Sequence, residues 1–192
     1  IIIIILTTFK IIIAQEYNIK ILGFNATDVS QNNEDSTSIN FKAQNRGIFD
    51  FIWPMNNYYR TIYNAENFSV QSWEKVINQG NIKEELGGTI DINGKVEYNN
   101  GTSFKSAKDT YNILSLIALV QHHNKDFFDT KWFDFEHYGS IGEARFLWSD
   151  SVNVFNVNDS ILCDHYRMDI NISDTTKKVK SSDYFMHNIV RE

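Results

Sequence analysis

Residues 84–98, which read EELGGTIDINGKVEY, decide the fold class of this chain. Asn93 and Gly94 tolerate the positive φ angles that a two-residue hairpin turn requires, and β-branched and apolar residues flank them on both sides. We therefore predict an antiparallel hairpin that joins a strand at Glu84–Ile92 to a strand at Lys95–Tyr98. A single proline in 192 residues and a high content of aromatic and β-branched residues favour strands in the rest of the chain as well.

The other segments that we expect to be strands share this composition. They lie at Tyr17–Phe24, Ser38–Gln44, Ile48–Trp53, Tyr58–Tyr63, Phe68–Gln79, Trp132–Tyr138, Glu143–Ser149 and Ile161–Ile170. A polar loop is expected at Asp28–Ser36, and turns are expected at 139–142 and 156–159.

One segment breaks the β pattern. After Asp109 and Thr110, either of which can cap a first helical turn, apolar side chains recur with the spacing of an amphipathic helix, namely Ile113, Leu116, Ile117 and Val120. The sequence therefore predicts a mainly β protein of one domain. Its sheet should be strongly curved and antiparallel, half-barrel or open-barrel-like, with one amphipathic helix at about 110–123 packed on it.

The first fourteen residues, IIIIILTTFKIIIA, are typical of the apolar part of a secretory signal peptide. They are too few to cross a hydrocarbon core, which needs about 20 residues, and Ala14 is a small residue of the kind found at cleavage sites. A buried first strand is the alternative, because Ile favours strands. We expect residues 1–14 to be a partial signal peptide and residues 15–192 to be one extracytoplasmic domain, truncated at its C-terminus. The expected location is periplasmic or secreted.

The charge balance limits the partners. The formal net charge is −6, and the only basic run is Lys177-Lys178-Val179-Lys180, which is typical of a solvated turn or strand edge. Nucleic acid is excluded as a partner because phosphates require clustered Lys and Arg. Cys163 is the single cysteine, so no internal disulfide is possible. No second apolar stretch is long enough to span a membrane in the mature chain.

Two constellations could carry chemistry. On a strand, Asp134 and Glu136 would share one face about 7 Å apart, close enough for acid–base work if burial separated their pKa values. The simpler interpretation is that this face points to water. His137 and His165 could hold a metal with a carboxylate if their strands were adjacent, but a hydrogen-bonded structural histidine is the simpler interpretation. We predict no catalytic residue, no cofactor and no metal, and keep these four residues as the candidates for an enzyme.

Aromatic side chains recur along the predicted strands. A curved sheet with many rings can enclose an apolar ligand cavity, particularly when a helix covers its open side, whereas rings that fill their own core are the alternative. The candidate ligand-binding residues are Trp53, Tyr59, Tyr63, Trp73, Trp132 and Trp148.

Several segments together resemble a known protein family. They are Gly23 in the early strand, the step Pro54–Tyr59 followed by Thr61-Ile62-Tyr63, the paired strands ending in Asn93-Gly94-Lys95, and the helix Thr110-Tyr111-Asn112-Ile113-Leu114-Ser115-Leu116. This pattern is similar to the bacterial exported proteins of the domain of unknown function 3108 family, over most of residues 16–190. The resemblance implies a single extracytoplasmic domain dominated by antiparallel strands, with a further strand pair beyond Glu192. It implies no reaction.

The expected function follows from the predicted extracytoplasmic location, the strands rich in aromatic residues and the lack of a catalytic motif. We expect an exported cell-envelope protein, non-enzymatic, that binds an apolar or lipid-like ligand, or an envelope partner, in the concavity of its sheet. A purely structural or interaction protein of the envelope is one alternative, and a metal- or carboxylate-dependent enzyme is the other.

Overall fold

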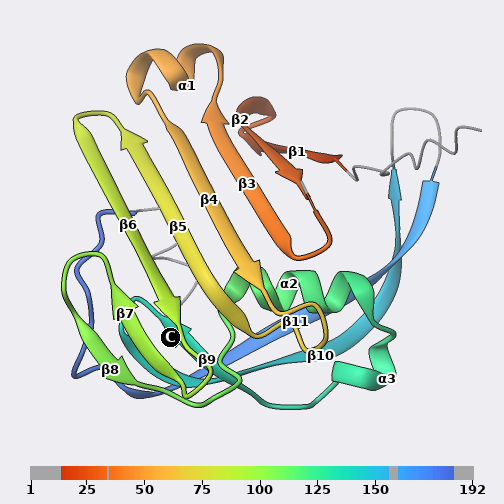
Figure 1. The fold of residues 1–192 in the computed structure, drawn as a ribbon. Coiled ribbons are helices and arrows are strands. Elements are labelled where there is room, and N and C mark those ends of the chain that lie inside the picture. Colours follow the sequence, from red (N-terminus) through yellow and green to blue (C-terminus); the bar gives the residue numbers. More distant parts are fainter. Residues whose placement is uncertain (1–13, 34, 156–159, 184–192) are drawn as a thin grey trace, which may run out of the picture.

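The computed structural model describes residues 14–33, 35–155 and 160–183, which form two antiparallel sheets and three helices (Figure 1). The prediction of a mainly β protein with an amphipathic helix is confirmed. The first sheet has eight strands in sequence order: β1 (Ala14–Ile21), β2 (Phe24–Asn32), β3 (Ser38–Asn45), β4 (Asn56–Tyr63), β5 (Val70–Gln79), β6 (Ile82–Ile90), β7 (Lys95–Tyr98) and β8 (Ser103–Lys105). The second sheet has the order β11 (Ser160–Asp174), β10 (Ser140–Phe155) and β9 (Phe133–His137).

Helix α2 (Ile113–His122) packs against both sheets. Its buried residues, such as Leu116 and Leu119, share one hydrophobic cluster with Ile39 and Ile77 of the first sheet and Phe135 of the second. We call the face of the first sheet that meets this cluster its inner face. Side chains on β4 and β5 alternate between this buried face and the opposite one, as the period of two in a strand requires.

The start of α2 is fixed by its cap. The Asn112 side chain accepts the Ser115 N–H (2.8 Å), and the Ser115 hydroxyl accepts the Asn112 N–H (3.1 Å), so two otherwise unpaired amides at the helix start are satisfied. The Asn112 amide also donates to Thr61 on β4 (3.0 Å), which anchors the helix to the sheet. The cap is therefore Asn112, three residues after Asp109 and two after Thr110, the two caps that were expected.

The connection between β3 and β4 corrects one prediction. Residues 48–53 are not a strand but belong mainly to α1 (Gly47–Ile52), none of whose side chains is buried. β3 and β4 are antiparallel neighbours, so the chain must reverse here, and the need for a connection overrides the strand preference of Ile and Phe. Gly47 has a positive φ of 56°, which suits its position at the reversal. A second short helix, α3 (Lys125–Phe128), follows α2.

The N-terminal hairpin corrects another prediction. The expected loop at Asp28–Ser36 is strand up to Asn32, because β2 lies between β1 and β3 and pairs with both. The polar side chains of this part of β2 do not interrupt its pairing, and one of them, Gln31, is buried. Conversely, Leu22 and Gly23 form the turn of the β1–β2 hairpin within the strand predicted at Tyr17–Phe24.

The predicted turn at 156–159 and residues 1–13 lie outside the described residues. Ala14, the expected last residue of the signal segment, begins β1. In the part of the chain that is described, none of the helices has the length and apolar character needed to cross a membrane.

Candidate functional site

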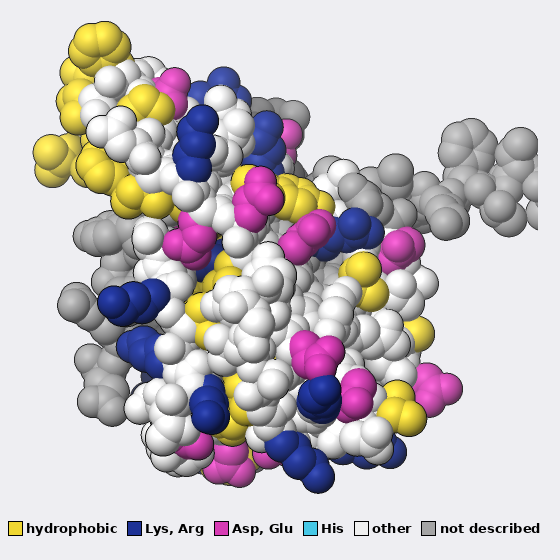
Figure 2. All heavy atoms as spheres, turned by 60° about the vertical axis from the view of Figure 1, so that its left-hand side comes forward, with side chains coloured by type: hydrophobic (Ala, Val, Ile, Leu, Met, Phe, Trp, Pro, Cys, Tyr) yellow, Lys and Arg dark blue, Asp and Glu magenta, His cyan; other side chains and the backbone are white. Residues whose placement is uncertain are grey.

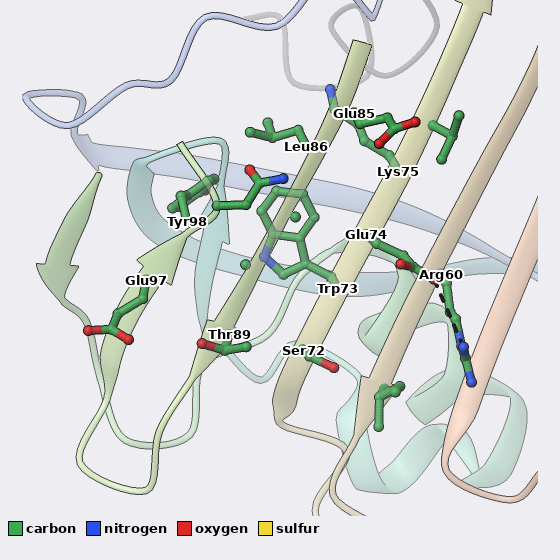
Figure 3. Close-up of a pocket in the computed structure, with 15 residues that line it drawn as sticks. Arg60, Ser72, Trp73, Glu74, Lys75, Glu85, Leu86, Thr89, Glu97 and Tyr98 are labelled. Carbon is green, nitrogen blue, oxygen red and sulfur yellow. Dashed lines mark ion pairs between the residues drawn. The ribbon is translucent and has the colours of Figure 1, made fainter. Parts of the chain in front are cut away.

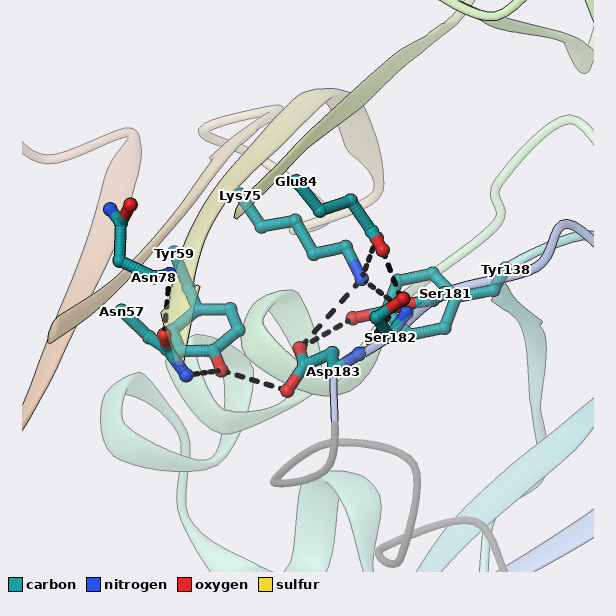
Figure 4. Close-up of polar contacts among 9 residues, drawn as sticks. All are labelled: Asn57, Tyr59, Lys75, Asn78, Glu84, Tyr138, Ser181, Ser182 and Asp183. Carbon is teal, nitrogen blue, oxygen red and sulfur yellow. Dashed lines mark hydrogen bonds and ion pairs between the residues drawn. The ribbon is translucent and has the colours of Figure 1, made fainter. Parts of the chain in front are cut away.

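A cluster of buried polar side chains lies on the inner face of the first sheet, where apolar residues are expected (Figure 4). At its centre is Lys75 on β5, which is only 2% exposed and shares its strand face with Trp73 and Ile77. Fully buried lysines are rare because an ammonium group loses much of its hydration in the protein interior. We call Lys75, Glu84, Tyr59, Tyr138 and Asp183 the lysine cluster.

Lys75 has partners on several sides. Its Nζ lies 3.2 Å from Glu84 Oε1 on β6 and 3.8 Å from Asp183 Oδ2. It donates a hydrogen bond to the Ser181 hydroxyl and lies 3.8 Å from the centre of the Tyr138 ring. The ammonium charge is therefore balanced by two carboxylates and by an aromatic face.

Two hydroxyl donors and one ammonium group, each from a different element, converge on the Asp183 carboxylate, which is fully buried. The Tyr59 hydroxyl, from β4, donates to Oδ1 (3.1 Å), and the Tyr138 hydroxyl, from the β9–β10 turn, donates to Oδ2 (3.2 Å). Lys75 supplies the positive charge. The Asp183 carboxylate is thus held by two hydroxyl donors and lies beside a buried cation.

Burial sets the protonation of this cluster. It lowers the pKa of Lys75, while the Asp183 and Glu84 carboxylates oppose that shift. Burial and the nearby Asp183 charge raise the pKa of both Tyr59 and Tyr138 far above its ordinary value. Burial alone would raise the pKa of Glu84, but the Ser182 N–H and Lys75 outweigh it and hold that pKa below its usual range. Both tyrosines are therefore hydrogen-bond donors at neutral pH.

Tyr138 is presented to Lys75 by a strained turn. Tyr138 and Gly139 are the two central residues of the β9–β10 hairpin, with φ angles of 49° and 77°, values that fit a type I′ turn. This two-residue turn is shorter than the turn predicted at 139–142 and begins one residue earlier. The first position of such a turn favours Asn, Asp or Gly, and a bulky residue at positive φ is uncommon and often marks a functional position.

Asp183 belongs to an irregular segment, residues 175–183, that we call the strap. Val179 N–H donates to Tyr138 O (2.7 Å), and Ser182 N–H donates to Glu84 Oε2 (2.7 Å). The Val179 side chain is buried in a second apolar cluster, whose other buried members are Val70, Trp73, Leu86, Ile90, Val96 and Tyr98. The strap thus places one apolar side chain and one carboxylate on adjacent parts of the sheet.

Glu136 is a second buried acid close to the turn. It is 2% exposed and accepts hydrogen bonds from the Tyr98 hydroxyl and from Gly139 N–H (2.7 Å). Burial raises the pKa of Glu136 to about 7, although both hydrogen bonds act in the opposite direction. The simpler interpretation of Asp134 and Glu136 as a water-facing pair is wrong for Glu136, since only Asp134 is exposed.

The space enclosed beside the lysine cluster is small. A cavity of about 40 Å³ lies between Tyr59, Lys75, Tyr138 and the first turn of α2. Pockets for drug-sized ligands begin at roughly 300 Å³, so this cavity has room for little more than water. A larger ligand on the inner face requires part of the chain to move.

A larger open groove of about 500 Å³ lies along β4–β7 (Figure 3). Gly87, which has no side chain, lies opposite Glu74 on β5, with Glu85 and Thr89 two positions away along β6. Arg60 Nη1 lies 3.9 Å from Glu74 Oε1, as the dashed line in Figure 3 marks. This groove is open to solvent and has both polar and apolar lining residues, and Glu97 in it pairs with Lys95.

The six aromatic residues predicted to bind a ligand do not line one cavity. Tyr59, Tyr63 and Trp73 are buried on the inner face, where Tyr63 stacks on Phe68 and Trp73 meets Tyr98 edge-on. The other three are partly exposed elsewhere. Trp53 follows α1, Arg145 lies over Trp132 (4.4 Å), and Lys125 lies over Trp148 (4.6 Å).

The candidate metal ligands are separated. β10 lies between the strands of His137 and His165, and these residues align with Ser140 and Asp150, about 30 Å apart along that strand. His165 Nδ1 instead lies 3.1 Å from Asp150. Among the described residues, no three His, Cys, Asp or Glu side chains come together in a way that could hold a metal ion.

Sequence reasoning missed Lys75, Tyr138 and Asp183 as site residues. Lys75 did carry a signal, because it stands at the inward position of the alternation Trp73, Lys75, Ile77. A charged residue whose side chain points to the buried face of a strand is stable there only if groups of opposite charge or hydrogen-bonding groups surround it. Asp183 carried no such signal, because the strap has no regular structure.

Comparison of the chain with models of known protein families, with curated proteins and with solved structures finds no match. The resemblance to the exported family stays a prediction, and the function must be argued from the site.

Proposed function

We propose that this protein is a non-enzymatic, exported cell-envelope protein that binds an amphipathic carboxylate, such as a fatty acid, on the inner face of its large sheet. The observation that carries the proposal is the convergence of the Lys75 ammonium group and the Tyr59 and Tyr138 hydroxyls on one buried carboxylate. These groups are donors matched to an anion, and they come from the sheet and the turn beside it.

The strap has the chemistry of such a ligand. Val179 fills the apolar cluster around Trp73 and Leu86, and Asp183 follows four residues later at Lys75. Four residues cover at most about 13 Å, so Val179 and Asp183 lie within the length of a medium-length acyl chain. We interpret the strap as an internal substitute for the ligand. Val179 takes the place of the acyl chain at the Trp73 cluster, and Asp183 takes the place of the carboxylate at Lys75.

Ligand binding then requires an exchange. The cavity of about 40 Å³ does not admit an acyl chain, so the ligand must displace the strap. Replacing the Asp183 carboxylate by another carboxylate leaves the Lys75 charge paired, which avoids the large penalty of an unpaired buried ion. The apolar contact of the acyl chain with the Trp73 cluster supplies the favourable free energy, about 25 cal/mol for each Å² removed from water.

Export is supported by the apolar residues 1–14. Cleavage after Ala14 would leave Gln15 as the first residue of the mature chain, inside β1. The extracytoplasmic location stays a proposal and is tested by N-terminal sequencing of the protein recovered from a bacterial periplasm.

The decisive test is a titration with a fluorescent fatty acid, cis-parinaric acid. We expect the wild-type protein to bind the acid and to bind its methyl ester at least about tenfold more weakly, because the ester has no charge for Lys75. In the variant Asp183→Asn the internal competitor is weakened, so binding of the acid should be tighter than in the wild type. Lys75→Met should abolish the preference for the acid.

Lys95→Met is the matched control, because Lys95 is exposed and pairs with the neighbouring Glu97. It should leave the titration unchanged. Equal binding of acid and ester would overturn the assignment of Lys75 as the head-group site. A folded wild type and a folded Asp183→Asn variant that both bind no acid would overturn the function and favour an interaction protein. The ester comparison needs no variant, so it decides the matter even if Lys75→Met does not fold.

A further inference from the structure

Strand β1 leaves one edge of the first sheet unpaired. It pairs with β2 on one side, and among the described residues no strand pairs with its other side (Figure 1). Edge strands are commonly protected from further pairing by proline, by a bulge or by being very short. β1 has eight residues and no proline, and the bulge between it and β2 places the extra residue, Ala26, on β2. The outer edge of β1 is therefore regular enough to pair with another strand.

One face of β1 also exposes apolar side chains. Tyr17, Ile19 and Ile21 alternate along the strand, so they share a face, and they are 45%, 37% and 46% exposed. A strand added at this edge would pair with the backbone and would also cover part of these side chains.

The two charges of β1 are placed symmetrically about Asn18. Glu16 lies two residues before it and Lys20 two residues after it, on the face opposite the apolar one. The residues directly opposite these two charges on β2 are the uncharged Ser30 and Asn25. β1 is therefore complementary to an antiparallel copy of itself, in which each Glu16 faces the other copy's Lys20.

Two-fold symmetry restricts the registers in which two copies of β1 can pair. In a symmetric antiparallel pair the same face of both strands lies on one side of the joined sheet, so a residue must lie on the two-fold axis. With Tyr17 on the axis, Glu16 would face Asn18. With Asn18 on the axis, Glu16 faces Lys20 and Tyr17 faces Ile19, which are two favourable kinds of cross-strand pair.

The charge of the whole chain makes such specific pairs necessary. Two copies with a net charge of −6 repel each other at long range. Lys and Arg side chains and Asp and Glu side chains are interspersed over the face that Figure 2 shows, so this face has no large area of one sign. Association then depends on individual pairs of opposite charge, and β1 supplies two of them, related by symmetry.

We propose that two copies of this chain join edge to edge through β1, antiparallel and centred on Asn18, to form one continuous sheet. The pairing uses residues 15–21, so it does not depend on whether residues 1–14 are retained. β1 contains no residue of the lysine cluster or the strap, so the dimer does not rest on the proposed function. One strand edge is a small contact, and we expect a Kd on the order of 10 μM.

The test reverses each charge of β1 separately and then combines the two variants. In Glu16→Lys, and likewise in Lys20→Glu, both symmetry-related pairs become like-charged. Sedimentation equilibrium should therefore show each variant alone to dimerise at least about tenfold more weakly than the wild type. An equimolar mixture of the two variants should dimerise with about the wild-type affinity, because in a mixed dimer both pairs have opposite charges again.

Glu97→Lys is the matched control, because it changes the net charge by the same amount as Glu16→Lys at an exposed residue of β7, at the other end of the same sheet. It should change the Kd about twofold or less. A wild type that stays monomeric at about 300 μM would overturn the proposal. So would single variants that dimerise as well as the wild type, or a mixture that dimerises no better than its components. Glu16 and Lys20 are exposed, so we expect all variants to fold, which circular dichroism checks.

Discussion

Single buried residues in this protein have protonation states set by their surroundings. Glu136 has no cation among its named partners; it is held by Tyr98 and Gly139, and burial raises its pKa to about 7. Lys75, in contrast, is surrounded by carboxylates and still has a lowered pKa. In both cases the loss of hydration is the largest effect, which distinguishes this interior from an exposed ion-pair network.

Glu136 should make stability depend on pH. Its pKa is about 7 in the folded state against an ordinary 4.5, so the folded state holds one more proton than the unfolded state between these values. Its stabilising contribution is complete below about pH 4.5 and is lost as the pH rises through about 7, a loss on the order of 3 kcal/mol. Glu136→Gln stays neutral and keeps an acceptor, so its stability relative to the wild type should rise between about pH 5 and pH 8.

The measurement is urea denaturation of both proteins at several pH values. Glu85→Gln is the control, because Glu85 is exposed on β6, and its curve should follow that of the wild type. Parallel curves for Glu136→Gln and the wild type would contradict the assigned pKa.

At the scale of single strands and helices, local sequence signals are sufficient to predict some elements and not others. The predicted hairpin around Asn93 and Gly94 forms and Gly94 has a positive φ of 80°, but Asn93 does not, so the prediction of a two-residue turn is wrong. Its loop is longer than predicted and spans Asp91–Gly94, because the Asp91 side chain accepts the N–H groups of Asn93 and Lys95. The segment 48–53 has equally strong strand residues yet forms α1, since no strand propensity encodes the need to connect β3 and β4.

The cap of α2 should contribute measurably to stability. Asn112→Ala removes the hydrogen bond to Ser115 and the contact with Thr61, so we expect a loss of about 1–2 kcal/mol in the free energy of unfolding. Asn124 stands at the same position before α3, but its side chain makes no cap hydrogen bond. Asn124→Ala is therefore a matched control and should cost about 0.5 kcal/mol or less. Equal losses in the two variants would show that the cap of α2 is not special.

At the scale of the whole molecule, the fold class could be predicted and the site could not. The spacing of apolar residues and the residues typical of turns are signals within short segments, and they identified most strands and the apolar stripe of α2. The lysine cluster joins Lys75 to a residue more than a hundred positions later, in a segment without periodicity. The expectation of a curved sheet with many aromatic residues suggested an open cavity, whereas α2 and Phe135 of the second sheet pack against the inner face of the first sheet.

The molecule should open locally at the strap before it unfolds globally. Residues 175–183 make few backbone hydrogen bonds to the rest of the chain, whereas β4 and β5 are each paired on both sides. In native-state hydrogen exchange, the Val179 amide should therefore exchange with a smaller opening free energy than the amides of β4 and β5. The variant Asp183→Asn should reduce the opening free energy of the Val179 amide further. If a peptide containing the strap exchanged only by global unfolding, the strap could not act as a displaceable substitute for a ligand.

The sequential order of the first sheet has a consequence for how a molecule is first made. Each of its strands after β1 pairs with the strand that precedes it, so the sheet can form progressively from the N-terminal end of the chain. The strap arrives later, and its contact from Asp183 to Tyr59 spans 124 positions. A molecule that folds from its N-terminal end passes through a stage in which Tyr59 and Lys75 are in place before Asp183 reaches them. We expect that an amphipathic acid present during that stage would bind at a rate set by folding and not by the opening of the finished protein.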